Sequence, residues 1–483
     1  MQNAPRIIIG ALRGGSGKTL ISIGVTAALR RRGLSIAVFK KGPDYIDAGW
    51  LGKAAQRPCR NLDSYLFDKE TLKKSFCESS KDQDISIIEG NRGLFDGVNA
   101  SGEYSSAELA KLLKTPVILI VDASKMTRTA AALVLGCQSL DPDVLIKAVI
   151  LNRVAGPRHE KTLRDSIEDY CSIPVIGAIN KLSLENFPQR HLGLLPLSEH
   201  SAANEIVDTV GNLVERSIDL DELMKLARAA TPFCCQQMFE KQSKVISEHE
   251  NLKIGILRDS AFQFYYPENL QALTSTGASL VEITALEPRP LPPVDALYIG
   301  GGFPETHAEV LANNTIFKQS LLSAIKTGLP VYAECGGLMY LARQLTVDET
   351  TYPMVGVFDV ETVLERRPQG HGYMVVNVVV ANPFFPVGSV LKGHEFHYSF
   401  IPSEKISSNS YAFKVIRGHG INGSLDGIFR YRTLGTYLHL HSLGTPSWAS
   451  AILKQAQTYH EMSFNYTNGQ SLSENYSFKH DGL

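Results

Sequence analysis

The sequence predicts two α/β domains, each built around a largely parallel β-sheet. Short runs rich in Ile and Val recur before helix-compatible stretches at residues 7–9, 36–39, 85–88, 117–121, 148–151 and 175–178, and a second series starts afresh at 253–257, 279–283, 296–299 and 331–333. Apolar strands that alternate with helices are typical of a buried parallel sheet. The length of 483 residues exceeds one ordinary core and fits two domains of about 200 residues each.

The domain boundaries follow from changes in this pattern. Residues 1–196 are expected to form the first domain, and residues 251–455 the second. Between them, residues 197–250 become helical and charged, which predicts a connector. Residues 456–483 are polar and poor in aliphatic side chains, so we expect a loosely held C-terminal tail.

The composition is that of an ordinary globular protein, with 44% hydrophobic and 20% charged residues. A net charge of -1 provides no general attraction to nucleic acid or an anionic membrane, so we expect small-molecule partners. The seven cysteines form no CxxC pair and their number is odd, which favours a reducing compartment. With no signal-peptide pattern and no membrane-spanning run, a cytoplasmic location is predicted. No motif indicates the oligomeric state, so a homodimer stays an open alternative.

A glycine-rich loop, LRGGSGKT at residues 12–19, follows the first expected strand and precedes a helix-compatible run. In this order, backbone N–H groups face a phosphate, Lys18 adds a positive charge and the Thr19 hydroxyl can bind Mg²⁺. Leu12 stands where the usual P-loop has glycine, so the loop resembles the deviant P-loops of the dethiobiotin-synthetase and MinD-like class; a chance glycine turn is the disfavoured alternative. The expected ATP-binding residues are Arg13, Gly14, Gly15, Ser16, Gly17, Lys18 and Thr19.

Polar residues follow three other strands of the first domain. Glu89 ends the run at 85–89 and is the candidate carboxylate for Mg²⁺, together with Thr19. Asp44, Asp47 and Asp96 come from loops expected at the same sheet edge. A single aspartate after a strand is as often a helix cap or turn residue, but their joint placement favours function. Asn152, after the run at 148–151, is either a ligand of the nucleotide base or a turn residue.

In the second domain, Cys335 lies between an expected strand and an expected helix and is followed by two glycines. This pattern predicts a nucleophile elbow, in which the helix N-terminus favours thiolate over thiol; a buried structural cysteine is the weaker alternative. About 100 residues later, His439 and His441 offer a base. Backbone N–H groups of Gly301, Gly302 and Gly336 are candidates for binding an oxyanion.

These motifs carry a specific resemblance. GGGFPE (300–305), AECGG (333–337) and YLHLH (437–441) resemble class I glutamine amidotransferases, which have a flavodoxin-like α/β fold. With KGPDYID (41–47), NLDS (61–64), EGNRGLFDG (89–97), GHGY (370–373) and GHEFHYS (393–399), the chain resembles the cobyrinate a,c-diamide synthase family to about residue 455. Members of that family join a P-loop NTPase-like, dethiobiotin-synthetase-like domain to a glutaminase.

The resemblance implies an enzyme that uses ATP, Mg²⁺ and glutamine to amidate the a- and c-acetate carboxylates of cobyrinate through acyl phosphates. Cys335 would attack glutamine and His439 would transfer the proton. Asp44, Asp47 and Asp96 match family positions near the reacting carboxylate. Class I enzymes usually carry His-x-Glu, but the residue two after His439 is His441, so the third member of the triad is not identified.

A carboxylate-rich macrocycle needs a cationic and aromatic wall. The candidates are Tyr45, Arg367, His371, Tyr373, His394 and His397, and core packing is an equal alternative for each histidine.

Three competing interpretations remain. The same amidation of Ni-sirohydrochlorin, on the route to coenzyme F430, would use every motif named above. Cobyric acid synthase is a less favoured relative because it amidates other side chains. A MinD-like regulatory ATPase would share the P-loop but would not need Cys335 or His439.

Overall fold

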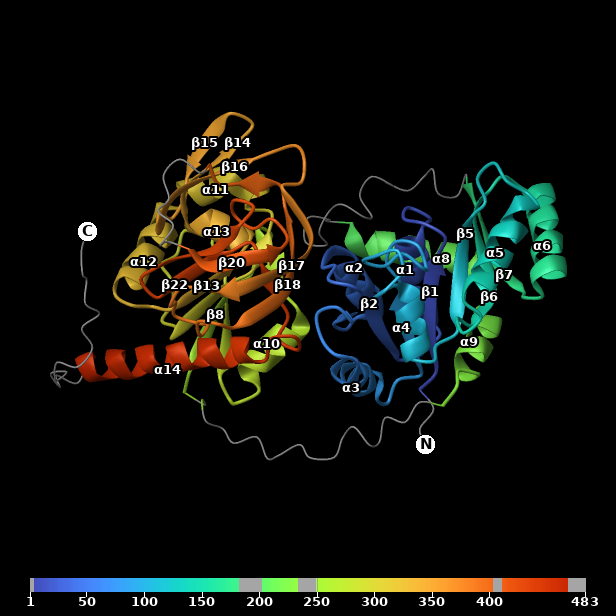
Figure 1. Cartoon of the computed structure of the whole chain (residues 1–483), viewed down its shortest axis with the longest axis horizontal. Helices are drawn as coiled ribbons and strands as arrows, with labels where there is room; N and C mark the ends of the chain where they lie inside the picture. Colours follow the sequence, from blue (N-terminus) through green and yellow to red (C-terminus); the bar gives the residue numbers. More distant parts are fainter. Residues whose placement is uncertain (1–3, 182–201, 233–248, 250, 403–410, 468–483) are drawn as a thin grey trace. The chain divides into compact units, whose positions relative to one another are not determined.

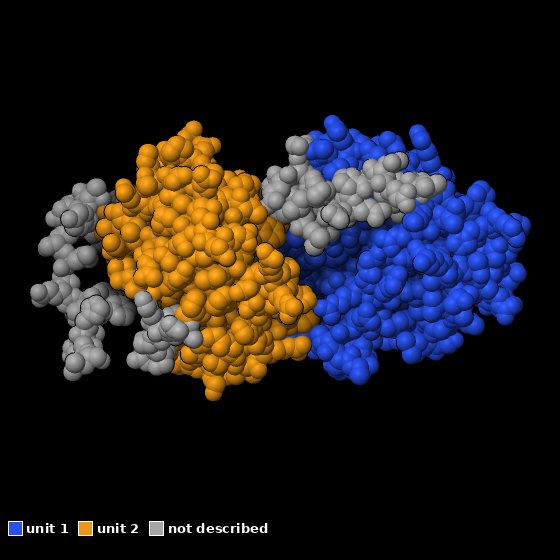
Figure 2. Space-filling model, turned by 90° about the horizontal axis from the view of Figure 1, so that it is seen from above, with its two compact units in different colours: residues 1–243 blue, residues 244–483 orange. Residues whose placement is uncertain are grey.

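The computed structural model describes residues 4–181, 202–232, 249, 251–402 and 411–467 (Figure 1). The chain divides into two compact units, Met1–Ser243 and Lys244–Leu483, which Figure 2 colours separately. Each unit has its own sheets and hydrophobic core, which confirms the predicted α/β class. In the described ranges, no helix combines the length and the apolar character that crossing a bilayer requires.

Within the described residues, unit 1 is built on a seven-stranded sheet in the order β3-β2-β4-β1-β5-β6-β7, and every neighbouring pair is parallel. All residues of β1, β4 and β5 are buried, as expected for a parallel sheet that helices cover on both faces. The strands are β1 (Arg6–Ala11), β2 (Ile36–Lys41), β3 (Arg60–Leu62), β4 (Ile85–Glu89), β5 (Val117–Asp122), β6 (Ile146–Val154) and β7 (Val175–Asn180).

Among the described helices of unit 1, α1 to α6 lie between successive strands or strand segments of the sheet, and α8 and α9 follow β7 (Figure 1). They are α1 (Lys18–Arg31), α2 (Ile46–Ala55), α3 (Lys69–Ser80), α4 (Ser106–Leu112), α5 (Thr129–Leu140), α6 (Pro157–Cys171), α8 (Ala203–Ser217) and α9 (Leu220–Arg228).

The helices α8 and α9 lie in the segment expected to be a connector, yet they belong to the core of unit 1. Val207, Val210 and Val214 of α8 are buried with the side chains of α1. A Cβ atom on Gly24 would come within 2.3 Å of Val214 Cγ2, so α1 and α8 pack closely. The first unit therefore extends at least through α9, because these amphipathic helices bury their apolar faces against it.

Unit 2 contains a mixed sheet of ten described strands, in the order β10-β8-β11-β13-β22-β21-β20-β17-β18-β23. Pairs from β10 to β22 are parallel, and pairs from β22 to β23 are antiparallel. The strands are β8 (Lys253–Leu257), β10 (Ser279–Ile283), β11 (Ala296–Ile299), β13 (Val331–Glu334), β17 (Gly370–Val378), β18 (Val390–His397), β20 (Tyr411–Arg417), β21 (Leu425–Arg430), β22 (Thr433–Thr436) and β23 (His439–Leu440).

Smaller elements complete unit 2. The described residues form a two-stranded sheet of β9 (Phe262–Phe264) and β12 (Gly301–Gly302), and a four-stranded sheet of β14 (Ala342–Val347), β15 (Thr350–Pro353), β16 (Phe358–Leu364) and β19 (Ser399–Phe400). The helices are α10 (Pro267–Thr274), η3 (Pro304–His307), α11 (Ala308–Asn313), α12 (Thr315–Lys326), α13 (Gly336–Leu341) and α14 (Ser447–Thr467).

Helix α14 extends beyond the C-terminal boundary expected for the second domain. It continues through Thr467, whereas a polar tail was expected from residue 456. Trp448, Ile452 and Ala456 are buried in the core of unit 2, so the first turns of α14 are held by packing.

Candidate active sites in the two units

The phosphate loop joins β1 to α1, as the sequence predicts. Gly17 has φ 94°, a left-handed conformation that favours glycine. A Cβ atom there would meet Asn152 Nδ2 at 2.3 Å, and this amide donates a hydrogen bond to Ser16 O (2.8 Å). Asn152 is 1% exposed and comes from β6. It therefore braces the loop from inside the protein, while its expected contact with a nucleotide base stays a prediction.

Thr19 and Glu89 meet at this loop. Thr19 Oγ1 donates to Glu89 Oε1 (2.7 Å), and Glu89 is fully buried at the end of β4. Glu89 Oε2 is buried without a hydrogen-bond partner among the described residues. A half-buried hydroxyl beside a buried carboxylate with a spare oxygen fits Mg²⁺, which is held by few protein oxygens together with substrate phosphates and water. The pair expected from the sequence is thus brought together by the fold.

Lys40 is a residue that the sequence reasoning missed. It is the second-last residue of β2, its side chain is 2% exposed, and its ammonium contacts Asp47 Oδ2 (2.6 Å) and Glu89 Oε1 (2.8 Å). Burial alone would lower the pKa of Lys40, but the charges of Asp47 and Glu89 outweigh burial and raise it. Burial raises the pKa of Glu89 to about 7, although Lys40 opposes the shift. A buried lysine at the carboxyl end of a parallel strand whose other residues up to Phe39 are apolar was the signal that could have identified this residue.

The three expected aspartates have different surroundings. Asp47 contacts Lys40, as described above, whereas Asp44 Oδ1 accepts from Asp47 N (2.8 Å) beside the first turn of α2. Burial, followed by the charge of Asp47, raises the pKa of Asp44 to about 6. Asp96 Oδ2 accepts from Gly93 N (2.8 Å) and so shapes its own loop. Half-buried Tyr45 directly precedes α2.

The cations of the loop make contacts of their own. Lys18 Nζ donates to Arg92 O (2.7 Å), and its pKa is lowered by burial and then by Lys40, against the carboxylates of Glu89, Asp47 and Asp96. Lys40 and Glu89 lie at the carboxyl ends of β2 and β4, and Asp47 and Asp96 follow these two strands, so the four charges act on Lys18 at one sheet edge. The side chain of Arg13 is 71% exposed, and it pairs with Asp122 Oδ2 (3.2 Å), which also contacts Arg153 Nη1 (2.7 Å). Asp122 and Arg153 were not expected from the sequence.

In unit 2, Cys335 occupies the expected elbow between β13 and α13. Its φ of 48° and ψ of −100° lie outside the usual regions for a non-glycine residue, a strain that tight functional turns often hold. Its N–H donates to Thr436 O (2.7 Å), which joins the elbow to the strand that leads to His439. Burial, followed by the charge of Glu305, raises the pKa of the Cys335 thiol. The backbone N–H of Gly336 opposes this shift, and the thiolate expected from the sequence stays a prediction.

The glycine loop lies against both the elbow and the base. A Cβ atom on Gly336 would come within 3.1 Å of Gly302 N, and one on Gly301 would come within 2.6 Å of His439 Cε1. Only glycine allows the loop backbone to approach the elbow and the His439 ring so closely. The three expected oxyanion glycines are thus brought together, and their binding of an oxyanion stays a prediction.

His439 and His441 lie in two separate histidine–glutamate pairs. His439 Nδ1 is 3.6 Å from Glu334 Oε2, and its ring stacks on His394 with centroids 4.8 Å apart. His441 Nε2 is 3.7 Å from Glu268 Oε2. Glu334 was missed by the sequence reasoning, although a charged residue at the end of a buried strand, directly before the nucleophile, was a usable signal.

The residues expected to form the substrate wall divide into two groups. His394 and His397 are only 5% and 3% exposed. Burial lowers the pKa of His394 well below its usual value, and His397 stacks on Tyr437 with centroids 3.7 Å apart. We therefore leave both out of the wall, because core packing occupies their rings. His371 and Arg367 are exposed and Tyr373 is half-buried.

Phe396 belongs to the GHEFHYS motif but was not among the side chains expected to form the substrate wall. It is 40% exposed and lies across from His371 in the β17–β18 pair, with ring centroids 5.2 Å apart. Its carbonyl oxygen is 3.8 Å from Cys335 Sγ.

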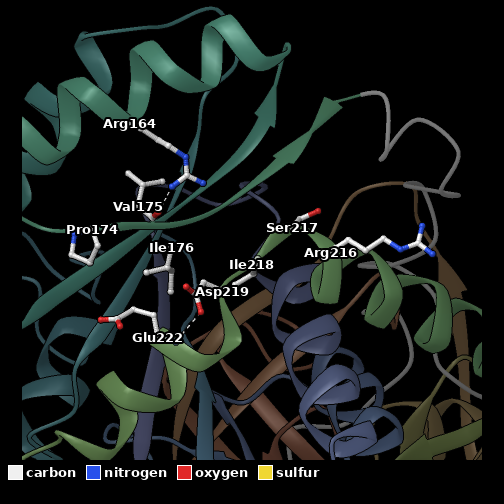
Figure 3. Close-up of a pocket in the computed structure, with 9 residues that line it drawn as sticks. All are labelled: Arg164, Pro174, Val175, Ile176, Arg216, Ser217, Ile218, Asp219 and Glu222. Carbon is white, nitrogen blue, oxygen red and sulfur yellow. Dashed lines mark hydrogen bonds between the residues drawn. The ribbon is translucent and has the colours of Figure 1, made fainter.

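A cavity of about 410 Å³ in unit 1 lies away from these residues (Figure 3). It is lined by the start of β7 and by α6, the end of α8 and the start of α9. The cavity lies at the amino end of β7, whereas the phosphate loop follows the carboxyl end of β1. These two ends lie at opposite edges of the parallel sheet. In this cavity the Arg164 side chain contacts Glu160 Oε1 (2.8 Å), and Asp219 caps α9, so both of these charged side chains have structural partners.

The fold and these two sites define a P-loop nucleotide-binding unit joined to a glutamine amidotransferase unit in one chain. Residues 7–194 match the CobQ/CobB/MinD/ParA nucleotide binding domain, and residues 253–446 match the CobB/CobQ-like glutamine amidotransferase domain. The chain belongs to the cobyrinate a,c-diamide synthase family.

Three relatives with that name illustrate the similarity. The chain is 42% identical to the protein of Magnetococcus marinus, over 92% of this chain and 96% of the relative. It is 40% identical to the protein of Archaeoglobus fulgidus, over 94% and 97%. It is 38% identical to the protein of Dehalococcoides mccartyi strain 195, over 95% and 99%.

Proposed function

We propose that this protein uses ATP and glutamine to convert the a- and c-acetate carboxylates of cobyrinate to amides through acyl phosphate intermediates. The observation that carries the proposal is the presence, in one chain, of a complete P-loop site and a cysteine elbow. The relatives that share both parts along nearly their whole length are named cobyrinate a,c-diamide synthase.

In unit 1, the carboxylate of the substrate attacks the γ-phosphate of ATP and ADP leaves. A free carboxylate is a poor acyl donor to ammonia because its charge repels the lone pair of the nucleophile and oxide is a poor leaving group. Lys18 and the N–H groups of the loop stabilise the charge on the transferring phosphoryl group. Thr19 and Glu89 would hold Mg²⁺, which supplies charge neutralisation on the phosphates. Lys40 holds Asp47 and Glu89 in place, and Asp44, Asp47 and Asp96 order the groups around the reacting carboxylate.

In unit 2, the thiol proton of Cys335 passes to His439 while sulfur attacks the side-chain amide carbon of glutamine. The tetrahedral oxyanion is bound by the backbone N–H groups of Gly302 and Gly336. His439 returns the proton to the leaving nitrogen, which departs as ammonia, and water hydrolyses the thioester to glutamate. Ammonia then attacks the acyl phosphate, and inorganic phosphate leaves.

The exposed side chains Arg367, His371 and Phe396, with Tyr373, are proposed to contact the macrocycle in unit 2, and Tyr45 is proposed to contact it in unit 1. A cation and aromatic rings suit a ligand with several carboxylates and a conjugated ring system. Arg367→Ala should raise the Michaelis constant for the macrocycle about tenfold and leave that for glutamine unchanged, as expected for one lost charge-assisted contact.

The proposal is tested with the full chain, ATP and Mg²⁺, supplied with cobyrinate or Ni-sirohydrochlorin, and with glutamine or ammonium chloride. Amidation of cobyrinate is expected with either nitrogen source. Preference for Ni-sirohydrochlorin would overturn the proposed substrate. Cys335→Ser should lose glutamine-dependent amidation and keep ammonium-dependent amidation, whereas the matched control Cys137→Ser keeps both. A regulatory ATPase would release no glutamate, and loss of both activities in Cys335→Ser would show that Cys335 has a different role.

A further inference from the structure

We propose that Glu334, the residue directly before the nucleophile, is the positioning carboxylate that orients His439 during glutamine hydrolysis. This inference rests on the proposed roles of Cys335 and His439. It supplies the third member of the triad, which the sequence pattern around His439 does not contain.

Glu334 is held in place at both of its carboxylate oxygens. It is the last residue of β13 and is fully buried. Oε1 accepts from Leu440 N (3.0 Å), the residue after the base, and Oε2 accepts from the hydroxyl of Tyr298 (2.9 Å). Oε2 also lies 3.6 Å from Nδ1 of His439. One carboxylate therefore contacts the backbone next to the base and faces the ring of the base itself.

The hydroxyl of Tyr298, which donates to Glu334 Oε2, keeps its proton throughout the working pH range. Burial, followed by the charge of Glu334, raises the pKa of Tyr298 well above its usual value, so its hydroxyl stays protonated. A fixed donor stabilises the ionised carboxylate, as buried charges require. The other titratable groups that face Glu334 and His439 from neighbouring elements are Tyr265, Tyr332, Cys335 and His394.

His441, at the position where class I enzymes usually have glutamate, belongs to a different pair. Its Nε2 lies 3.7 Å from Glu268 Oε2, and its Nδ1 accepts from Leu443 N (3.2 Å). The ring of Tyr266 packs on it with centroids 4.4 Å apart. Because Glu268–His441 has the same chemistry and burial as Glu334–His439, it provides a matched control.

The arrangement assigns the two ring nitrogens of His439. Because Nδ1 faces Glu334, Nε2 is left to take the proton of the Cys335 thiol. Glu334 stabilises the imidazolium that forms and keeps the ring oriented, and it takes no proton itself. The separation of 3.6 Å is too long for a hydrogen bond, and such contacts often shorten only when substrate binds.

The test compares Glu334→Gln, Glu334→Asp and Glu268→Gln in the full chain, with Cys335→Ser as the inactive reference. For Glu334→Gln we expect kcat for glutamate release to fall about 10²-fold, the lower range for general acid–base catalysis, with the KM for glutamine nearly unchanged. The acid limb of kcat/KM should move to lower pH, since a carboxylate favours the protonated imidazole and its removal favours the neutral base. Ammonium-dependent amidation should not change.

Two further results separate positioning from a structural role. Glu334→Asp should recover part of kcat and return the acid limb toward that of the natural enzyme, while Glu268→Gln should keep kcat within about threefold. Natural kcat in Glu334→Gln, loss of ammonium-dependent amidation in that variant, or an equal loss in Glu268→Gln would each overturn the inference. Glutamine hydrolysis that survives in Cys335→Ser would instead refute the proposed function.

Discussion

The close approach of Gly301 to His439 leads to a prediction whose size can be worked from the structure. A Cβ atom on Gly301 would lie 2.6 Å from Cε1 of His439, whereas ordinary van der Waals contacts begin near 3.4 Å. In Gly301→Ala, the ring must therefore withdraw by about 0.8 Å if the loop holds its place. Gly301 does not have a positive φ, so alanine adds no backbone strain there. A misplacement of about 1 Å in a catalytic group costs about 10²-fold in rate, or roughly 2.7 kcal/mol.

Steady-state glutamate release by Gly301→Ala measures this loss, with ammonium-dependent amidation as the internal reference. The loss should appear in kcat, because the glutamine-binding surface is altered little and the base is displaced. Gly136→Ala in α5, where an added Cβ meets nothing within 4 Å, is the control and should retain both activities. If Gly301→Ala kept kcat within about threefold of the natural enzyme, the loop would be able to move aside, and the argument that it positions His439 would be refuted.

Two other predictions concern buried charges. Lys40→Met should lower the free energy of unfolding of unit 1 by roughly 3–5 kcal/mol, since Glu89 and Asp47 lose their cation, and urea unfolding at pH 6 and pH 8 measures it. The loss of stability should be smaller at pH 6, because burial raises the pKa of Glu89 to about 7 and this carboxyl is then largely protonated. Adding Glu89→Gln to Lys40→Met should recover part of the lost stability. Equal losses at both pH values would contradict this reasoning. Burial also raises the pKa of Asp426 to about 6, so the folded state binds its proton more tightly than the unfolded state does. Its contribution to stability should fall by on the order of 3 kcal/mol as pH rises from about 4 to about 6. Asp426→Asn should remove this part of the pH dependence of the urea midpoint, and a difference between the two proteins that does not vary with pH would count against it.

The sequence alone predicted the two α/β domains, because apolar strand runs and helical patterns are local and repeat along the chain. It also indicated the phosphate loop, Glu89, the cysteine elbow and His439 as candidates, because each lies within a short local motif; their roles stay predictions. The connector and tail were less predictable: α8 and the first turns of α14 are ordered by burial of Val210 and Trp448 against distant segments.

What only the tertiary structure decided is which charged side chains meet. Lys40 and Glu89 are 49 positions apart, and Glu334 and Leu440 are 106 apart, so no local pattern relates them. Neighbouring parallel strands place their carboxyl ends at one sheet edge, although these ends are far apart in the sequence. There the buried carboxylates of Glu89 and Glu334 lie close to Lys40 and His439, respectively. The burial of His394 and His397 also depends on the tertiary structure. The alternation of side chains along a strand does not say which neighbouring segments cover each face of the sheet.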